Sequence, residues 1–213
     1  SIYQEAAQAE LAGVCDINTE RAEAAGRRFG VPWFPDAPTM LERVRPDICS
    51  ITTGGYEYSS DHYEPAIQAL EAGAHILCEK PICNDIAKAE EMVRVAKERE
   101  RSFGLDFNHR FTPAAYTAKK WLDEGRLGTI LFVNMALWIG KPQDPESPYF
   151  HIKALNPHSI DIIRHFCGDI TSVHCLAMKA PGRSIWSTAS FNFRLASGAR
   201  SEEHTSELQS RQS

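Results

Sequence analysis

The stretch that decides the fold is His75–Ile82, which reads HILCEKPI. Its apolar residues fall on both faces and the run is too short for a core helix, so we predict a buried parallel strand. The run ends abruptly at Glu79, Lys80 and Pro81, and doubly wound sheets bind ligands in the crevice beyond the carboxyl ends of their strands. Pro81 biases Lys80 away from the helical region, so the chain leaves the strand in a fixed turn. Lys80 is therefore a candidate for chemistry, and a solvated turn residue is the alternative.

The composition is typical of a soluble globular protein with one large or two small domains. The 213 residues are 43% hydrophobic and 24% charged, and no apolar run approaches the length of a membrane span. A net charge of −5 argues against nucleic acid or an anionic membrane surface as the main partner. The six cysteines form no CxxC pair and no zinc-like group with histidine. We therefore expect no metal site, and a reduced, cytoplasmic setting.

Neither end of the chain has the features of a natural terminus. The chain begins at Ser1 without a methionine or a signal peptide. Near the other end, residues 200–210 read RSEEHTSELQS, which resembles the translation of a widely used sequencing adapter and back-translates to it without a break. We therefore expect residues 200–213 to be a non-native tail, and the remaining chain to be truncated at both ends.

Strands and helices alternate through the first half of the chain. Besides the deciding stretch, we expect strands at residues 11–16, 48–53 and 103–107. Helices are expected at residues 18–29 with Asn18 as the cap and Gly30 as the stop, around Leu41, at residues 61–73, and after a cap at Asn84 or Asp85. This alternation predicts a parallel sheet with helices on both faces. We assign residues 1–107 to a Rossmann-type α/β domain without its first strand.

The pattern changes after Asn108. Long strands are expected at residues 129–139, 170–179 and 184–195, with few helices between them, one of which spans residues 157–166. Long neighbouring strands of this kind predict an α+β domain with an open, largely antiparallel sheet. We assign residues 108–199 to this second domain and expect it to be incomplete.

An acid follows the first expected strand. Asp16 lies where a dinucleotide-binding fold uses a carboxylate to bind the adenosine ribose. The alternative is an ordinary aspartate in a turn between a strand and a helix. No GxGxxG phosphate-binding turn occurs in the chain, and its expected place lies before Ser1.

Several histidines could also carry chemistry. His62 begins an expected helix, where an exposed or capping residue is the alternative. His109 and Arg110 follow the last strand of the first domain, where a domain-interface ion pair is the alternative. His158 and Asp161 are three residues apart on one expected helix and therefore share a face. His158 has the chemistry of a general base, and Asp161 suits a helix amino terminus.

Taken together, these motifs resemble those of the Gfo/Idh/MocA family of oxidoreductases. The resemblance covers residues 1–199 and rests most of all on the EKP stretch with the helix before it. The matching segments are Val14–Asp16, Pro46–Ile48, Ala69–His75, Cys78–Pro81, Asn108–Phe111 and His158–Asp161.

The resemblance implies an NAD(P)-dependent oxidoreductase that transfers hydride between a nicotinamide and a hydroxyl of a sugar, polyol or sugar derivative. It implies a Rossmann domain followed by a domain with a large open sheet, whose outer face often mediates homo-oligomer contacts. By the same resemblance Asp16 binds the ribose, which favours NAD over NADP, and Pro81 follows a cis peptide bond. The implied catalytic residues are Lys80 and His158. The implied cofactor-binding residues are Asp16, Thr53, Glu79, Lys80 and Asn108, and the implied substrate-binding residues are Lys80, Arg110, His158 and Asp161.

The chemistry of these side chains agrees with that reaction. Oxidising an alcohol needs a base for the hydroxyl proton, and His158 is such a group. The ammonium of Lys80 can stabilise negative charge that develops on the same oxygen, while the cofactor supplies the hydride chemistry.

One position departs from the family pattern. Many relatives carry an aspartate four residues before the histidine, and here that residue is Ala154. This departure keeps a non-catalytic binding relative open as an alternative. An NAD-dependent glycosidase of the same fold is a further alternative. Because the phosphate turn is absent, we expect these 213 residues alone to be inactive.

Overall fold

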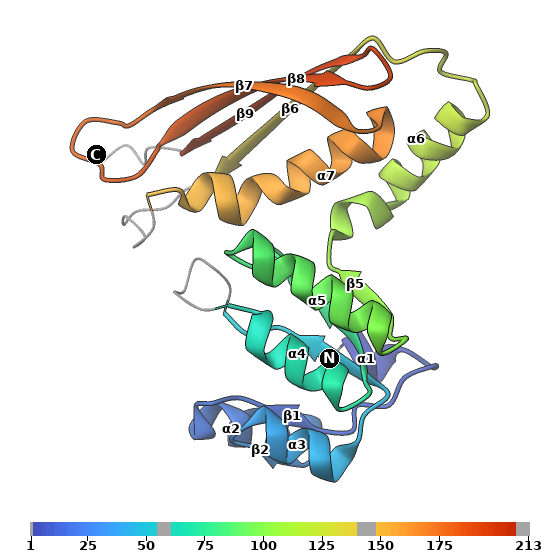
Figure 1. Cartoon of the computed structure of the whole chain (residues 1–213), viewed down its shortest axis with the longest axis vertical. Helices are drawn as coiled ribbons and strands as arrows, with labels where there is room; N and C mark the ends of the chain where they lie inside the picture. Colours follow the sequence, from blue (N-terminus) through green and yellow to red (C-terminus); the bar gives the residue numbers. More distant parts are fainter. Residues whose placement is uncertain (1, 55–60, 140–147, 208–213) are drawn as a thin grey trace. The chain divides into compact units, whose positions relative to one another are not determined.

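The computed structural model describes residues 2–54, 61–139 and 148–207. The chain divides into two compact units, with the first ending at Asp106 and the second continuing from Phe107. The sequence placed this boundary one residue later. Figure 1 labels the helices and strands of both units.

The strands of the first unit are all parallel, as predicted. β1 (Val14–Cys15) pairs with β2 (Trp33–Phe34), and β4 (His75–Cys78) lies between β3 (Ile48–Ile51) and β5 (Phe103–Leu105). Within the described residues, no strand joins β1 to β3. The doubly wound order 3-2-1-4-5-6 has its first strand at this place, between the strands that correspond to β1 and β3.

The helices of the first unit begin and end at the predicted signals. They are α1 (Ile2–Glu5), α2 (Thr19–Phe29), α3 (Ala37–Val44), α4 (Tyr63–Glu71) and α5 (Ile86–Glu98). Asn18 caps α2 by accepting a hydrogen bond from the backbone of Arg21, and Gly30 ends it with a φ of 69°. Asp85, rather than Asn84, caps α5.

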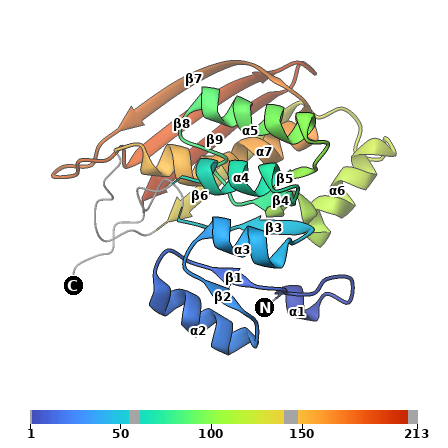
Figure 2. The same ribbon diagram turned by 60° about the horizontal axis from the view of Figure 1, so that its bottom comes forward.

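The core of the first unit lies between α4, α5 and one face of β3 and β4. Ile51, Ile76 and Cys78 point into it. Ile48 and Leu77 point to the other face and are 65% and 37% exposed. Figure 2 shows α2 and α3 on opposite sides of β1 and β2. The expected helices on both faces are therefore present for β1 and β2. For β3 and β4, α4 and α5 cover one face, and on the other the hydroxyl of Tyr3 in α1 donates to Ser50 at 2.8 Å.

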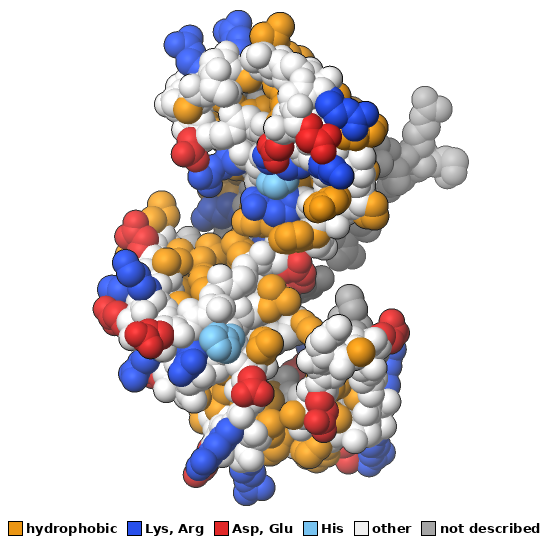
Figure 3. Space-filling view, turned by 90° about the vertical axis from the view of Figure 1, so that its right-hand side faces the viewer, with side chains coloured by type: hydrophobic (Ala, Val, Ile, Leu, Met, Phe, Trp, Pro, Cys, Tyr) orange, Lys and Arg blue, Asp and Glu red, His pale blue; other side chains and the backbone are white. Residues whose placement is uncertain are grey.

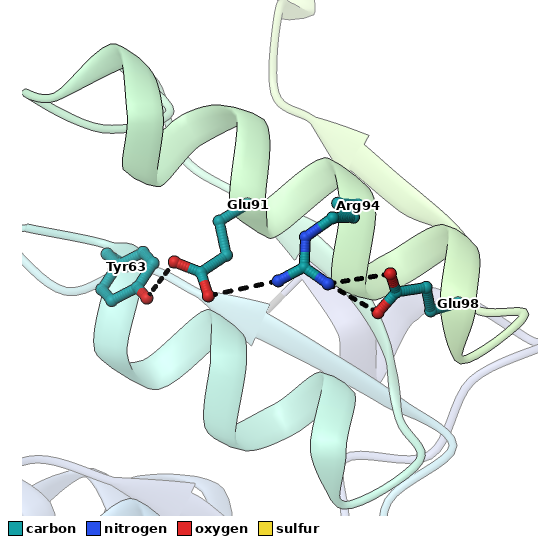
Figure 4. Close-up of polar contacts among 4 residues, drawn as sticks. All are labelled: Tyr63, Glu91, Arg94 and Glu98. Atoms are coloured by element: carbon teal, nitrogen blue, oxygen red, sulfur yellow. Dashed lines mark hydrogen bonds and ion pairs between the residues drawn. The ribbon is translucent and has the colours of Figure 1, made fainter.

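A chain of polar contacts joins α4 to α5 (Figure 4). The hydroxyl of Tyr63 donates to Glu91 at 2.6 Å, and Arg94 contacts both Glu91 at 3.4 Å and Glu98 at 2.8 Å. The hydrogen bond to Glu91 raises the pKa of Tyr63 to about 12. Exposed ion pairs of this kind stabilise little individually, but the chain ties the first turn of α4 to the middle of α5.

The second unit is a mixed sheet with one long helix on one face, as Figure 1 shows for α7. Its helical segments are η2 (Asn108–Phe111), α6 (Pro113–Asp123), η3 (His151–Leu155) and α7 (Asn156–Cys167), and its strands are β6 (Phe132–Ile139), β7 (Ile170–Met178), β8 (Thr188–Leu195) and β9 (Arg200–Glu207). The strand order is β6-β9-β8-β7, antiparallel throughout except for the parallel pair β6–β9. Ile163 and Cys167 of α7 pack against Phe191 and Phe193 of β8.

The structure differs from expectation at residues 200–207, which we set aside as a tail beyond the second domain. They form β9, an interior strand paired on both sides. Ser201, Glu203 and Thr205 of β9 are buried, and each has an oxygen without a hydrogen-bond partner in the described structure. Buried polar groups are normally paired, so the backbone of this segment suits the sheet whereas its inward side chains do not. The foreign origin of this segment stays a prediction.

The described surface carries both signs of charge. Figure 3 shows acidic and basic side chains interspersed over one face of each unit. None of the helices in the described ranges is both long and apolar enough to cross a membrane.

Candidate active site

The deciding stretch leaves the sheet at Glu79, and backbone hydrogen bonds hold it there. The amide of Glu79 donates to the carbonyl of Ile51 at 2.9 Å, which extends the contact between β3 and β4 by one step. The amide of Lys80 donates to the carboxylate of its neighbour Glu79 at 3.2 Å. The Lys80–Pro81 peptide bond is cis, as the resemblance implied. Glu79, Lys80 and Pro81 are all half-buried, so Lys80 is not a fully solvated turn residue.

Asp61 connects the start of α4 to the loop after β4. Its carboxylate accepts hydrogen bonds from the amide of Tyr63 at 3.0 Å and from the thiol of Cys83 at 3.4 Å. Partial burial acts against ionisation, but hydrogen bonds, that of Tyr63 foremost, lower the pKa of Asp61. Its backbone carbonyl also lies 3.5 Å from the hydroxyl of Thr53. The sequence did not single out Asp61, because an acid before a helix signals a cap and says nothing of a distant loop.

His62 follows Asp61 and is 1% exposed. Its Nδ1 lies 2.7 Å from the carbonyl oxygen of Pro81, and its Nε2 lies 3.1 Å from the carbonyl oxygen of Thr53. The side chain makes no capping hydrogen bond with α4. His62 is therefore not the exposed residue of the alternative, and although it holds the N-cap position of α4, its side chain does not cap the helix. It joins the two loops that follow β3 and β4.

Asp16 lies directly after β1 and is half-buried. Its Oδ1 accepts a hydrogen bond from the amide of Asn18 at 2.8 Å, and its own amide donates to the carbonyl of Phe34 at 3.3 Å. The structure thus gives Asp16 the contacts of an aspartate in a turn between a strand and a helix. Its ribose-binding role stays a prediction.

In the second unit, η2 and the first turns of α7 bring together the other candidate residues. The ring of His109 stacks on the ring of His158 with centroids 4.2 Å apart, and Phe107 meets His158 edge-on at 6.2 Å. Two nitrogens of Arg110 donate hydrogen bonds to the carboxylate of Asp161. The Nε of Arg110 lies 2.8 Å from Oδ2. Asn108, at the start of η2, is exposed.

The contact between Arg110 and Asp161 resolves one of the alternatives. An ion pair was the alternative for Arg110, and the structure shows one, whose two partners both belong to the second unit. Asp161 is buried and Arg110 is one-third exposed. Because each satisfies the charge of the other, their first role is to hold η2 against α7. Substrate binding by either residue stays a prediction.

The sequence did not predict one contact near His158, that between Asn156 and Glu203. Asn156 is fully buried and donates to Glu203 at 3.2 Å. Burial raises the pKa of Glu203 to about 7. Ala154, where many relatives have a carboxylate, is buried in η3. Asn156 and Glu203 are 47 residues apart, and the sequence carries no sign of that pairing.

An open depression of about 820 Å³ lies at the other end of the first sheet. Asp47 and His75, which line it, precede or begin β3 and β4. Doubly wound sheets bind ligands beyond the carboxyl ends of their strands, so this depression is not the site that contains Lys80. In the described part of the chain, no three residues of the kind that hold a metal come together.

Comparison with known proteins gives matches over both units. Residues 1–107 match the family described as "Oxidoreductase family, NAD-binding Rossmann fold", and residues 116–212 match the GFO/IDH/MocA C-terminal domain. D-glucoside 3-dehydrogenase from Escherichia coli K12 is 34% identical over 122 residues, which are 57% of this chain and 34% of that protein. Levoglucosan dehydrogenase from Pseudarthrobacter phenanthrenivorans is 30% identical over 176 residues, which are 76% of this chain and 44% of that protein.

Solved structures agree with these matches. A levoglucosan dehydrogenase in complex with NADH and levoglucosan has a TM-score of 0.81 at 26% identity, over 94% of this chain and 59% of that one. The chain thus spans less than two thirds of the length of these relatives. Since the first profile alone covers half of its residues, the chain belongs to the GFO/IDH/MocA oxidoreductase family.

Proposed function

We propose that these residues are part of an NAD-dependent dehydrogenase that oxidises a hydroxyl of a sugar, polyol or sugar derivative. The observation that carries this proposal is the placement of Lys80. It follows the middle strand of β3-β4-β5 at the carboxyl end, half-buried on a cis-proline turn. The relatives support the same reaction class, because those named above are sugar dehydrogenases and one is solved with NADH.

The residues present fit two of the three parts of a dinucleotide. The half-buried carboxylate of Asp16 follows β1, where it suits the adenosine ribose, and Thr53 and Glu79 follow β3 and β4, where they suit the nicotinamide end. Asn108, at the start of η2, is proposed as a further contact to the cofactor. The turn for the pyrophosphate has no counterpart in the sequence. An acid at position 16 would repel the extra phosphate of NADP, so NAD is the proposed cofactor.

In the proposed chemistry, His158 acts as the acid–base group and Lys80 provides a fixed positive charge. When bound, the nicotinamide supplies the hydride acceptor. His158 takes the hydroxyl proton, and stacking on His109 fixes its ring. The ammonium of Lys80 stabilises the charge that develops on the substrate oxygen. Arg110 and Asp161 are proposed substrate contacts in addition to their structural pairing.

Two further proposals concern the setting of the protein. The six cysteines are free, with Cys78 buried and its pKa raised by that burial to about 12, as expected for thiols that pack as apolar groups. This favours a reducing cytoplasm. The outer face of the second sheet exposes Leu176 and Met178 of β7, and apolar surface of this kind favours a homo-oligomer.

The experiment is to incubate the complete protein with NAD and a panel of sugars, polyols and glycosides, and to follow both NADH and the sugar products. Net NADH with an oxidised sugar supports the proposal. Cleavage of a glycoside without net NADH would favour the glycosidase. Tight NADH binding with no turnover on any substrate would favour a non-catalytic relative, for which the buried Ala154 gives a structural reason.

A further inference from the structure

His62 makes two contacts that one neutral imidazole cannot satisfy together. Its Nδ1 lies 2.7 Å from the carbonyl oxygen of Pro81, and its Nε2 lies 3.1 Å from the carbonyl oxygen of Thr53. Carbonyl oxygens only accept hydrogen bonds, whereas a neutral imidazole has one donor and one acceptor nitrogen. A neutral ring would therefore point a lone pair at one of the two oxygens.

We propose that His62 is a positioning residue that donates from both ring nitrogens and thereby fixes the Lys80–Pro81 turn against the loop after β3. The cation would be buried, since the side chain is 1% exposed. The two carbonyl oxygens at hydrogen-bond distance from the ring offset part of that cost, because each accepts from a charged donor.

The position of Lys80 follows from contacts on both of its sides. Before it, the amide of Glu79 is held by the carbonyl of Ile51 on β3. After it, the carbonyl of Pro81 is held by His62, and Cys83 is held by Asp61. The turn is thus fixed at three points within five residues, with Lys80 between the first and the second.

Neither an exposed nor a capping side chain would account for the two contacts between the His62 ring and the carbonyl oxygens. A capping residue would bond to its own helix, and an exposed residue would leave the two carbonyls to water. Removing the ring leaves carbonyl oxygens of Thr53 and Pro81 without their protein donor, which gives the loops freedom to separate. A shift of about 1 Å at a reacting group costs on the order of 100-fold in rate.

The first arm of the test measures protonation directly. The 213-residue chain is labelled with 15N-histidine, and long-range 1H–15N spectra are recorded at neutral pH, with the His62→Gln variant used to assign the signals. We expect two protonated ring nitrogens on His62. One protonated and one unprotonated nitrogen would overturn the proposal, and this arm needs no turnover.

The second arm is kinetic and rests on the proposed function. In the complete protein, His62→Phe is expected to lower kcat by about 10- to 100-fold, and His62→Gln, whose amide keeps two N–H donors, to recover part of the loss. The matched control is His75→Phe at the opposite end of β4, where Nδ1 accepts one hydrogen bond from the amide of Ser102 at 2.8 Å.

Equal kcat values for the His62→Phe and His75→Phe proteins would overturn the positioning role. If His62→Phe does not fold, the comparison of His62→Gln with wild type and the spectra decide. If the wild-type protein itself shows no turnover, the proposed function fails. The spectra still test whether His62 donates from both ring nitrogens.

Discussion

Arg110 and Asp161 are 51 residues apart in the sequence and form a two-pronged ion pair in the second unit. Arg110 comes from η2, and Asp161 lies one turn after His158 on α7. The pair therefore fixes the part of α7 that carries the proposed base. A planar guanidinium matches a carboxylate with two parallel hydrogen bonds, which a lysine cannot reproduce.

Breaking this pair should destabilise the second unit strongly. Asp161→Asn leaves Arg110 without its counter-charge in a site where the aspartate is buried. We expect a loss of about 2–4 kcal/mol in the free energy of unfolding, somewhat below the cost of breaking a fully buried pair because Arg110 is partly exposed. Urea unfolding measures it. The matched control is Asp169→Asn, whose pair with Arg164 is exposed on both sides and should be worth under about 1 kcal/mol. Equal losses would contradict the structural role.

Glu203 should make the stability of the chain depend on pH. Burial raises its pKa from 4.5 to about 7, so between these values the folded chain keeps a proton that the unfolded chain releases. The free energy of unfolding therefore falls as the pH rises through this window, by about 3 kcal/mol in total. The measurement is denaturant unfolding at a series of pH values for the wild-type chain and Glu203→Gln. Subtracting the two curves removes other groups, such as His165, whose pKa burial lowers. A flat difference curve would show that Glu203 is not buried.

Apolar residues on the inward face of β9 should make the fold more stable. Ser201 and Thr205 have buried hydroxyls without partners in the described structure. Replacing both with valine removes these hydroxyls, and we expect a gain of about 1–3 kcal/mol in the free energy of unfolding. The control is Thr171→Val on β7, where the hydroxyl is exposed and donates to the carbonyl of Arg194 at 3.0 Å, so no gain is expected. A loss for the double variant would mean that β9 does not occupy this place in the sheet.

Asp16 should set the choice of cofactor in the complete protein. Asp16→Ala removes both the ribose contact and the repulsion of the extra phosphate, so the ratio of kcat/KM for NAD to that for NADP is expected to fall by about 10- to 100-fold. Steady-state rates with each cofactor measure this ratio. Glu20→Ala, an exposed acid in the first turn of α2, serves as the control and should leave the ratio unchanged. An unaltered ratio for Asp16→Ala would show that this acid only shapes its turn.

Local signals explain which parts of the fold the sequence predicted. Asn18 and Gly30 marked the ends of α2 correctly, because caps act within one helical turn. The short apolar run before Glu79 predicted β4, and its charged end predicted where Lys80 would lie. These features depend on neighbours in the chain, and so they can be read from it.

Contacts between distant segments explain what the sequence missed. His62 is buried because the carbonyls of Thr53 and Pro81, 9 and 19 residues away, meet at the ends of two strands. The sequence likewise could not identify Asp161 as the partner of Arg110, because the two residues are 51 positions apart. Residues 200–207 were set aside on their resemblance to an adapter, yet the sheet has a place for a strand there that their polar side chains fill poorly.

The most direct test of the central claim is the rate of NADH formation by the Lys80→Ala variant of the complete protein, measured on the sugar that the wild-type protein oxidises best. The ammonium at the end of β4 is expected to act mainly in the transition state, so we predict a fall of at least about 100-fold in kcat, with the fold and NADH binding retained. Lys97→Ala, an exposed lysine near the end of α5, controls for loss of charge. Unchanged turnover by Lys80→Ala would contradict the assignment of the active site.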